Sequence, residues 1–150
     1  MSDKLRKNVL GVIFDDERNV LIVSRSNDPL HWQFPQGGID EGEEVLEALF
    51  REMLEEIGTD KAEIVGEYPE WLSYDFPEKI ARNMKPYKGQ TQRYFLVKLH
   101  KEAEINLDTK HPEFMSYKFV DVETLLDYTA HFKKPVYETV VNYFKNEGLL

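Results

Sequence analysis

The sequence predicts one mixed α/β domain that spans residues 1–150. With 41% hydrophobic and 13% aromatic residues, a chain of 150 residues can bury one sizeable core, and its length favours a single domain. Short stretches with strand-like alternation follow one another along the chain, and only two stretches have clear helical character. This order of many strands and few helices predicts a mixed α/β fold.

The first two elements are expected to form a hairpin. Residues 9–14 and 20–24 are mostly aliphatic, as buried strands are, and the polar stretch 15–19 between them predicts a turn. The loop 36–42 follows and carries three glycines. Because glycine has no Cβ, such a loop permits tight turns and a close approach of the backbone to a phosphate or a metal ion.

A helix is expected over residues 44–57, where Leu, Ala, Glu, Met and Arg predominate, and Gly58 is a natural helix stop. Five apolar side chains are expected to form the stripe that faces the core: Leu46, Leu49, Phe50, Met53 and Ile57.

The second half of the chain predicts further strands and a last helix. The strands are expected at 64–68, 71–76, 93–99 and 117–120. Pro135 suits the first position of the last helix, and Gly148 ends it. The inward side chains of this helix are expected to be Val136, Val140, Val141 and Phe144.

The composition limits the partners and the compartment. A net charge of −9 argues against broad nonspecific binding of nucleic acid, so no DNA partner is predicted and any RNA contact has to be local. One basic interval without an acid after Glu78 could make such a contact, and it contains Lys79, Arg82, Lys85, Lys88 and Arg93. The chain has no cysteine, no signal-like apolar start and no apolar run near the roughly 20 residues that cross a bilayer. A cytoplasmic protein without a membrane partner is therefore expected.

The acidic helix predicts a metal site. On a helix, Glu52, Glu55 and Glu56 stand at positions i, i+3 and i+4 and share one face. Three carboxylates on one face repel each other, and a divalent cation would relieve that repulsion. Hard oxygen ligands favour Mg²⁺, Mn²⁺ or Ca²⁺ over zinc. The alternative is an ordinary acidic helix that faces solvent.

The same segment resembles the Nudix box, G-x5-E-x7-R-E-U-x-E-E-x-G-U, in which U is a bulky aliphatic residue. Thr59 is the one departure, and it affects local packing rather than the catalytic positions. The resemblance implies a mixed sheet flanked by helices, an α/β/α sandwich, and Mg²⁺-dependent hydrolysis with Mn²⁺ as a possible substitute. The matching residues are Gly37, Glu43, Arg51, Glu52, Met53, Glu55, Glu56 and Gly58.

Further segments along most of the chain carry a second resemblance: residues 32–39, 71–74 with Pro77, 89–95, 104–107, 112–114, and 132–133 followed by 136–137. They resemble the bacterial RNA 5′-pyrophosphohydrolases, also described as dinucleoside polyphosphate hydrolases. This resemblance implies that Glu113 is a further metal ligand or base, and that Arg6 touches phosphate. Lys7 replaces the proline usual after that arginine, so this chain keeps the arginine but loses the rigid residue beside it.

The remaining candidate residues have a binding role or a structural one. Glu43 and Arg51 are interpreted as a brace between loop and helix, because a bidentate pair of arginine and carboxylate is common. Trp32 either stacks on a base or belongs to the core. Phe132 either stacks on a base or lies on the solvent-exposed approach to the last helix. The predicted substrate-binding residues are Arg6, Trp32, Gln33, Gly37, Gly38, Tyr74, Gln90, Phe132 and Lys133.

Three functions remain open at this point. The first is conversion of 5′-triphosphate or 5′-diphosphate ends of RNA to monophosphates, which would mark the RNA for decay. The second is hydrolysis of dinucleoside polyphosphates, and the third is a nucleotide sensor without catalysis. Metal ions held by Glu52, Glu55, Glu56 and Glu113 would neutralise the polyphosphate and activate a water. Glu55 and Glu113 are both candidates for the base that takes its proton.

Overall fold

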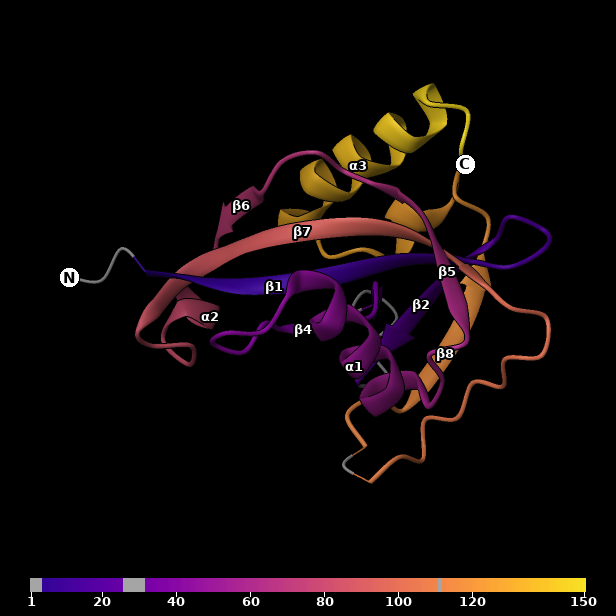
Figure 1. Cartoon of the computed structure of the whole chain (residues 1–150). Helices are drawn as coiled ribbons and strands as arrows, with labels where there is room; N and C mark the ends of the chain where they lie inside the picture. Colours follow the sequence, from indigo (N-terminus) through magenta and orange to yellow (C-terminus); the bar gives the residue numbers. More distant parts are fainter. Residues whose placement is uncertain (1–3, 26–31, 111) are drawn as a thin grey trace.

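The computed structural model describes residues 4–25, 32–110 and 112–150, and these form a curved mixed sheet with helices on both faces (Figure 1). The strands in order along the main path are β3 (Trp32–Gln33), β2 (Val20–Ser24), β1 (Lys4–Phe14), β7 (Tyr87–Leu99) and β5 (Ala62–Glu67). Three more strands pair beside this path: β4 (Gln36–Gly38) on β1, β6 (Leu72–Asp75) on β7, and β8 (Ser116–Val120) on β2.

The helices are few and short. They are α1 (Val45–Ile57), the single turn α2 (Glu78–Ala81) and α3 (Lys134–Asn146), with 3-10 turns at Leu125–Tyr128 (η1) and His131–Lys133 (η2). Helices α1 and α3 lie on opposite sides of the sheet (Figure 1). The structure therefore has the α/β architecture with flanking helices that the sequence predicts.

The central strands bury side chains on both faces because each is apolar without interruption over its middle. On β1, Leu10 and Val12 join the cluster that contains the inner face of α3, whereas Val9 and Ile13 join the cluster that contains α1. Strands β1 and β7 run parallel from Leu5 beside Gly89 to Phe14 beside Lys98. This pairing forms the middle of the sheet on which the cavity described below is built.

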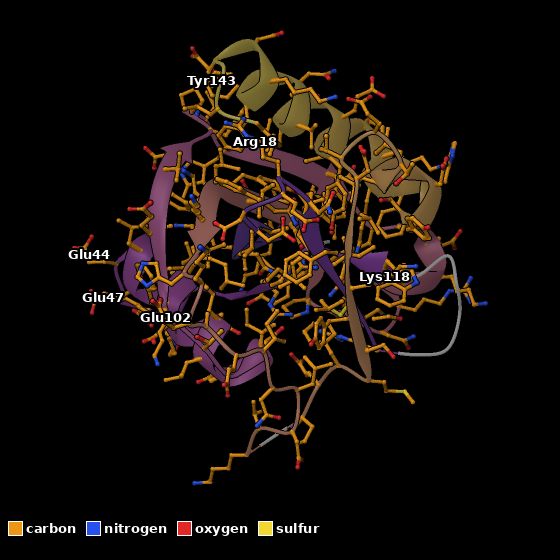
Figure 2. The ribbon with its side chains drawn as sticks, turned by 90° about the vertical axis from the view of Figure 1, so that its right-hand side faces the viewer. Arg18, Glu44, Glu47, Glu102, Lys118 and Tyr143 are labelled. Carbon is orange, nitrogen blue, oxygen red and sulfur yellow. The ribbon has the colours of Figure 1, made fainter. Side chains whose placement is uncertain are left out.

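Helix α1 begins and ends at residues suited to those positions. The Glu44 N–H donates to Glu47 Oε1 at 3.3 Å, and Gly58 ends the helix with a left-handed φ of 75°. Figure 2 shows Glu44 and Glu47 directed outward from this first turn. Thr59, the departure from the Nudix box, is buried, and its Oγ1 accepts the Lys61 N–H at 3.1 Å.

The predicted hairpin is confirmed, since β1 and β2 pair antiparallel with Phe14 opposite Val20. Some expectations were wrong in detail. Leu46 is 42% exposed and lies outside the core stripe of α1. Strand β7 begins at Tyr87 rather than at residue 93, and the turn α2 was missed.

The last helix also differs slightly from its prediction. Val140, Val141 and Phe144 are buried as expected, whereas Val136 is only partly buried. Tyr137, which the apolar pattern did not identify, is 1% exposed and stacks on Phe34 with 4.3 Å between ring centroids. Among the described residues, no helix is both long enough and apolar enough to cross a bilayer.

Candidate active site

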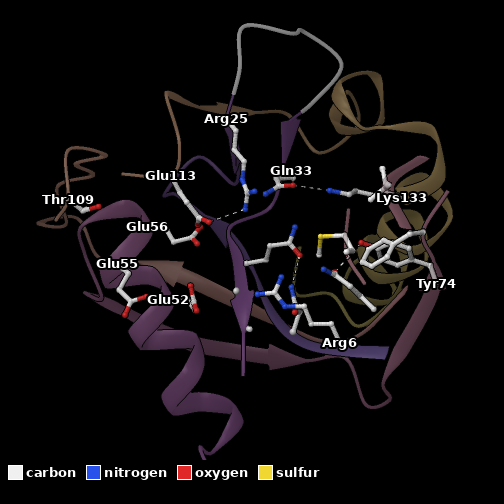
Figure 3. Close-up of a pocket in the computed structure, with 18 of the residues that line it drawn as sticks. Arg6, Arg25, Gln33, Glu52, Glu55, Glu56, Tyr74, Thr109, Glu113 and Lys133 are labelled. Carbon is white, nitrogen blue, oxygen red and sulfur yellow. Dashed lines mark hydrogen bonds and ion pairs between the residues drawn. The ribbon is translucent and has the colours of Figure 1, made fainter. Parts of the chain in front are cut away.

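A cavity of about 910 Å³ lies between the acidic side of α1 and the half of the sheet near α2 (Figure 3). Its walls come from β1, β3, β4, α1, β6, α2, β7, η2, the residue after β2 and the loop before β8. Figure 3 shows Glu52, Glu55, Glu56 and Glu113 at one end, and Tyr74 and Lys133 at the other.

Glu56 occupies the most buried position among the acidic residues of this cavity. Only 6% of the residue is exposed, and its Oε2 has no hydrogen-bond partner. Burial, together with the hydrogen bond and negative charge of Glu113, raises the pKa of Glu56 from 4.5 to about 10. Burial also raises the pKa of Glu52, although Arg51 opposes that shift.

Arg51 fixes the acidic side of α1 against the preceding loop. Its Nε and Nη2 donate to the two carboxylate oxygens of Glu43 at 2.8 and 2.9 Å, and Nη2 also donates to the Gly38 carbonyl at 2.9 Å. Its Nη1 donates to Glu52 at 2.8 Å and to Glu55 at 3.2 Å. The hydrogen bond from Arg51 is the main reason that the pKa of Glu43 falls to about 2. Glu43 and Arg51 are thus arranged as a bidentate brace.

Gly37 lets the loop pass directly against the carboxylate of Glu52. A Cβ at Gly37 would lie 1.8 Å from Cδ of Glu52, so any side chain there would displace the Glu52 carboxylate from its position. At Gly38, the nearest atom to an added Cβ is Nη2 of Arg6 at 3.2 Å, the end of a flexible side chain. The glycine requirement is therefore much stricter at Gly37.

Glu113 approaches the acidic helix from the loop before β8. It shares a hydrogen bond with Glu56, which is the main cause of the lowered pKa of Glu113. Arg25, at the end of β2, donates from Nη2 to Glu113 Oε1 at 3.3 Å and also lines the cavity. The sequence analysis missed Arg25, because a single arginine after a strand belongs to no spacing pattern.

The far end of the cavity combines aromatic rings with a partly buried lysine. The rings of Tyr74 and Phe132 lie 5.6 Å apart at an angle of 53°. Lys133 Nζ donates to Gln33 Oε1 at 2.8 Å, and burial lowers the pKa of Lys133 to about 8. A π-face and nearby polar groups suit a nucleobase.

Unpartnered polar atoms are concentrated in this cavity. Within the described part of the chain, five buried side-chain nitrogen or oxygen atoms lack a hydrogen-bond partner. Four of them belong to residues that line the cavity: Asn8, Gln33, Glu56 and Thr109. Because a buried unpaired polar atom costs about 1–3 kcal/mol, their location indicates a site whose polar groups are satisfied by a ligand.

The structure brings most of the predicted site residues together, but not all. Arg6, Gln33, Gly37, Gly38, Tyr74, Gln90, Phe132 and Lys133 line the cavity with the four glutamates. Trp32 does not line it; its ring packs beside the core and lies 4.5 Å from Nζ of Lys118. In the described ranges, no three acidic, histidine or cysteine side chains already stand together as metal ligands. The roles of the individual residues remain predictions.

Known proteins resemble this chain over nearly its whole length. Residues 4–140 match the family model described as the Nudix domain. A protein of Nitratiruptor sp. named RNA pyrophosphohydrolase is 56% identical over 97% of this chain and 96% of its own. Proteins with the same name from Campylobacter jejuni (52%; 97% and 96% covered) and Helicobacter pylori (46%; 98% and 97%) are similar as well.

Solved structures agree at the level of the fold. The dihydroneopterin triphosphate pyrophosphohydrolase of E. coli has a TM-score of 0.73 at 23% identity, covering 95% of this chain and 99% of its own. The Ap4A hydrolase of C. elegans has a TM-score of 0.67 at 19% identity, covering 93% and 98%. Because the sequence matches the family model over residues 4–140, and the fold and the acidic cavity agree with it, the chain belongs to the Nudix family.

Proposed function

We propose that this protein is an RNA 5′-pyrophosphohydrolase that converts the 5′-triphosphate or 5′-diphosphate end of RNA to a monophosphate and so initiates decay of the RNA. One observation carries the proposal: full-length relatives at 46–56% identity are named RNA pyrophosphohydrolases. The cavity supports it, because acidic, basic and aromatic groups suited to a metal, a phosphate and a base line one space. The absence of cysteine fits the cytoplasm in which such RNA occurs.

The carboxylates of the site fit divalent cations, and Nudix hydrolases generally use such ions. Glu52, Glu55, Glu56 and Glu113 offer only oxygen ligands, which favours Mg²⁺, with Mn²⁺ as a substitute. The unpartnered Oε2 of Glu56 is an acceptor that a cation would satisfy. When bound, the cations supply charge neutralisation at the phosphates and lower the pKa of a coordinated water.

The remaining steps are neutralisation of the phosphate, support of the carboxylates and acceptance of a proton from water, and side chains of this site can perform each of them. Arg6 and Arg25 line the cavity and can neutralise phosphate oxygens. Arg51 holds Glu52 and Glu55 in place through its hydrogen bonds. Glu55, which is 58% exposed, and Glu113, which is 46% exposed, are both accessible enough to accept a proton from water.

Hydrolysis of a dinucleoside polyphosphate is the competing function, because it needs the same acidic site and only a second nucleoside pocket. The decisive experiment compares kcat/KM for a triphosphorylated RNA and for diadenosine tetraphosphate at equal concentrations, with Glu52→Gln as the inactive control. We expect the higher value for RNA. A higher value for the dinucleotide would overturn the RNA assignment, and binding without turnover of either substrate would indicate a sensor.

A further inference from the structure

A buried hydrogen-bond network lies under the cavity. Gln90, Gln92 and Tyr94 alternate along β7 and therefore point to the same face of the sheet. Gln90 lines the cavity, whereas Gln92 and Tyr94 are 2% and 0% exposed and lie beneath it. The Tyr94 hydroxyl donates to Gln92 Oε1 at 2.5 Å. Burial raises the pKa of this hydroxyl well above its usual range, so it stays protonated and remains a donor.

The contact with Tyr94 determines which way the Gln92 amide faces. Because the Gln92 oxygen faces Tyr94, its Nε2 faces the cavity side and donates to Gln90 Oε1 at 2.9 Å. A longer contact of 3.5 Å joins the same Nε2 to Gln36 Oε1. Tyr74 adds a second donor to Gln90 Oε1 at 3.1 Å, and Asn8 Nδ2 a second donor to Gln36 Oε1 at 3.4 Å.

The two glutamines of the cavity floor are thereby oriented alike. Gln90 and Gln36 both line the cavity and both direct their carbonyl oxygens into the network. An amide has one acceptor end and one donor end, so their NH₂ groups are the ends left for a ligand. Phosphate and base carbonyl oxygens are acceptors, and donor groups on the floor suit them.

We infer that Tyr94, which does not touch the cavity, is a positioning residue for substrate binding: through Gln92 it makes the floor amides of Gln90 and Gln36 present N–H donors to the phosphorylated substrate. Without the Tyr94 hydroxyl, the Gln92 amide loses its preferred orientation and can turn its oxygen toward Gln90. Gln90 would then expose its own oxygen to an anionic ligand. This inference rests on the proposed hydrolysis of phosphoanhydrides at the same site.

The test is steady-state kinetics of Tyr94→Phe with triphosphorylated RNA. The substitution removes one oxygen and keeps the ring, so the fold should persist, as a thermal melt and circular dichroism would verify. We expect KM to rise about fivefold, as loss of roughly one hydrogen bond implies, with little change in kcat. The matched control is Tyr137→Phe, another buried tyrosine, whose hydroxyl instead accepts the Phe34 N–H at 3.2 Å. It should leave KM unchanged.

A double-mutant cycle of Tyr94→Phe and Gln92→Met distinguishes an effect of Tyr94 through Gln92 from a general loss of core packing. Gln92→Met removes the same link from its other side and should raise KM to a similar extent. Adding Tyr94→Phe to Gln92→Met should raise KM no further, because Tyr94 acts only through Gln92. An unchanged KM in Tyr94→Phe, additive effects in the cycle, or an equal rise in Tyr137→Phe would overturn the inference. Failure of the wild-type protein to hydrolyse RNA would instead refute the proposed function.

Discussion

At the scale of one residue, Glu56 shows how the acidic site lowers the stability of the folded protein when its carboxylates are charged and no cation is bound. Its folded-state pKa of about 10 lies above the ordinary value of 4.5, so the folded protein holds this proton more tightly than the unfolded chain does. The stabilisation that this proton provides is complete below a pH of about 4.5 and is lost as the pH rises toward about 10. Between these values, the metal-free protein should become less stable with increasing pH.

Glu56→Gln tests this linkage and the metal site together. In the presence of a chelator, the melting temperature of the wild-type protein should fall as the pH rises through that window, by about 2–4 °C for each kcal/mol of stability lost in a protein of this size. Glu56→Gln should flatten this dependence, because glutamine does not titrate. Added Mg²⁺ should raise the melting temperature of the wild-type protein but not of the variant, and the variant should be inactive. Full activity of the wild-type protein in chelator would contradict the metal assignment.

At the scale of elements, the hydrogen bonds of Arg51 connect α1 to the loop that precedes it. Arg51→Lys keeps the charge but loses the planar fork that contacts Glu43, Glu52 and the Gly38 carbonyl. We expect unfolding free energy to fall by about 1.5–3 kcal/mol, measured by urea denaturation, and kcat to fall because Glu52 and Glu55 lose their support.

The matched control for Arg51→Lys is Arg82→Lys, directly after α2. Arg82 contacts Glu78 at 3.6 Å, and both side chains are at least 70% exposed. Such a surface pair contributes about 0–1 kcal/mol, so the control should change little. A similar loss of stability in both variants would show that the change from arginine to lysine itself, rather than the contacts of Arg51, lowers the stability.

Some elements could be predicted from the sequence and others could not, for a physical reason. The hairpin was predicted because each of its strands contains an uninterrupted apolar run and a polar turn lies between them. Helix α1 was predicted because its apolar residues repeat with the helical period. The first half of β7 was missed because Gln90 and Gln92 are polar where a strand would normally be apolar. Gln90 lines the cavity, and Gln92 belongs to the hydrogen-bond network beneath it. Helix α2 is a single turn and is too short to show a period.

The candidate site was predicted wherever its residues belong to a recognisable spacing. The glutamates of α1 follow from positions in one helix, and the structure places them at one cavity. Arg25, Asn8 and Gln36 come from other strands or their ends, and only tertiary pairing brings them together. The network beneath the floor depends on buried geometry, which no local pattern encodes.

At the scale of the whole molecule, the distribution of charge bears on the choice between RNA and a dinucleotide. The chain has a net charge of −9, yet Lys79, Arg82, Lys85 and Lys88 are exposed in and after α2. Ile80 and Met84 of the same segment line the cavity. The basic side chains are therefore carried by a segment that forms part of the cavity wall, although they do not line the cavity themselves.

An RNA continues beyond its first nucleotides and offers further phosphates to this basic segment, whereas diadenosine tetraphosphate ends at its second nucleoside. The double variant Lys79→Glu and Lys85→Glu should therefore weaken binding of an RNA of several nucleotides and leave binding of the dinucleotide nearly unchanged. Losing two phosphate contacts should reduce the slope of log K against log salt by about 1.4 for a single strand. Binding is measured with the Glu56→Gln protein, so that no substrate is consumed during the titration.

The matched control makes the same change of charge at the opposite end of β7. Lys61 and Lys101 are exposed there, and the His100 N–H donates to the Lys61 carbonyl at 3.0 Å beside the end of that strand. If long-range charge alone governed RNA affinity, Lys61→Glu with Lys101→Glu would weaken binding as much as the pair near α2. Equal salt slopes for RNA and dinucleotide, or equal losses in the two double variants, would contradict a path for RNA over α2. A selective loss near α2 would support such a path, because only a polymeric substrate extends from the cavity to these basic side chains.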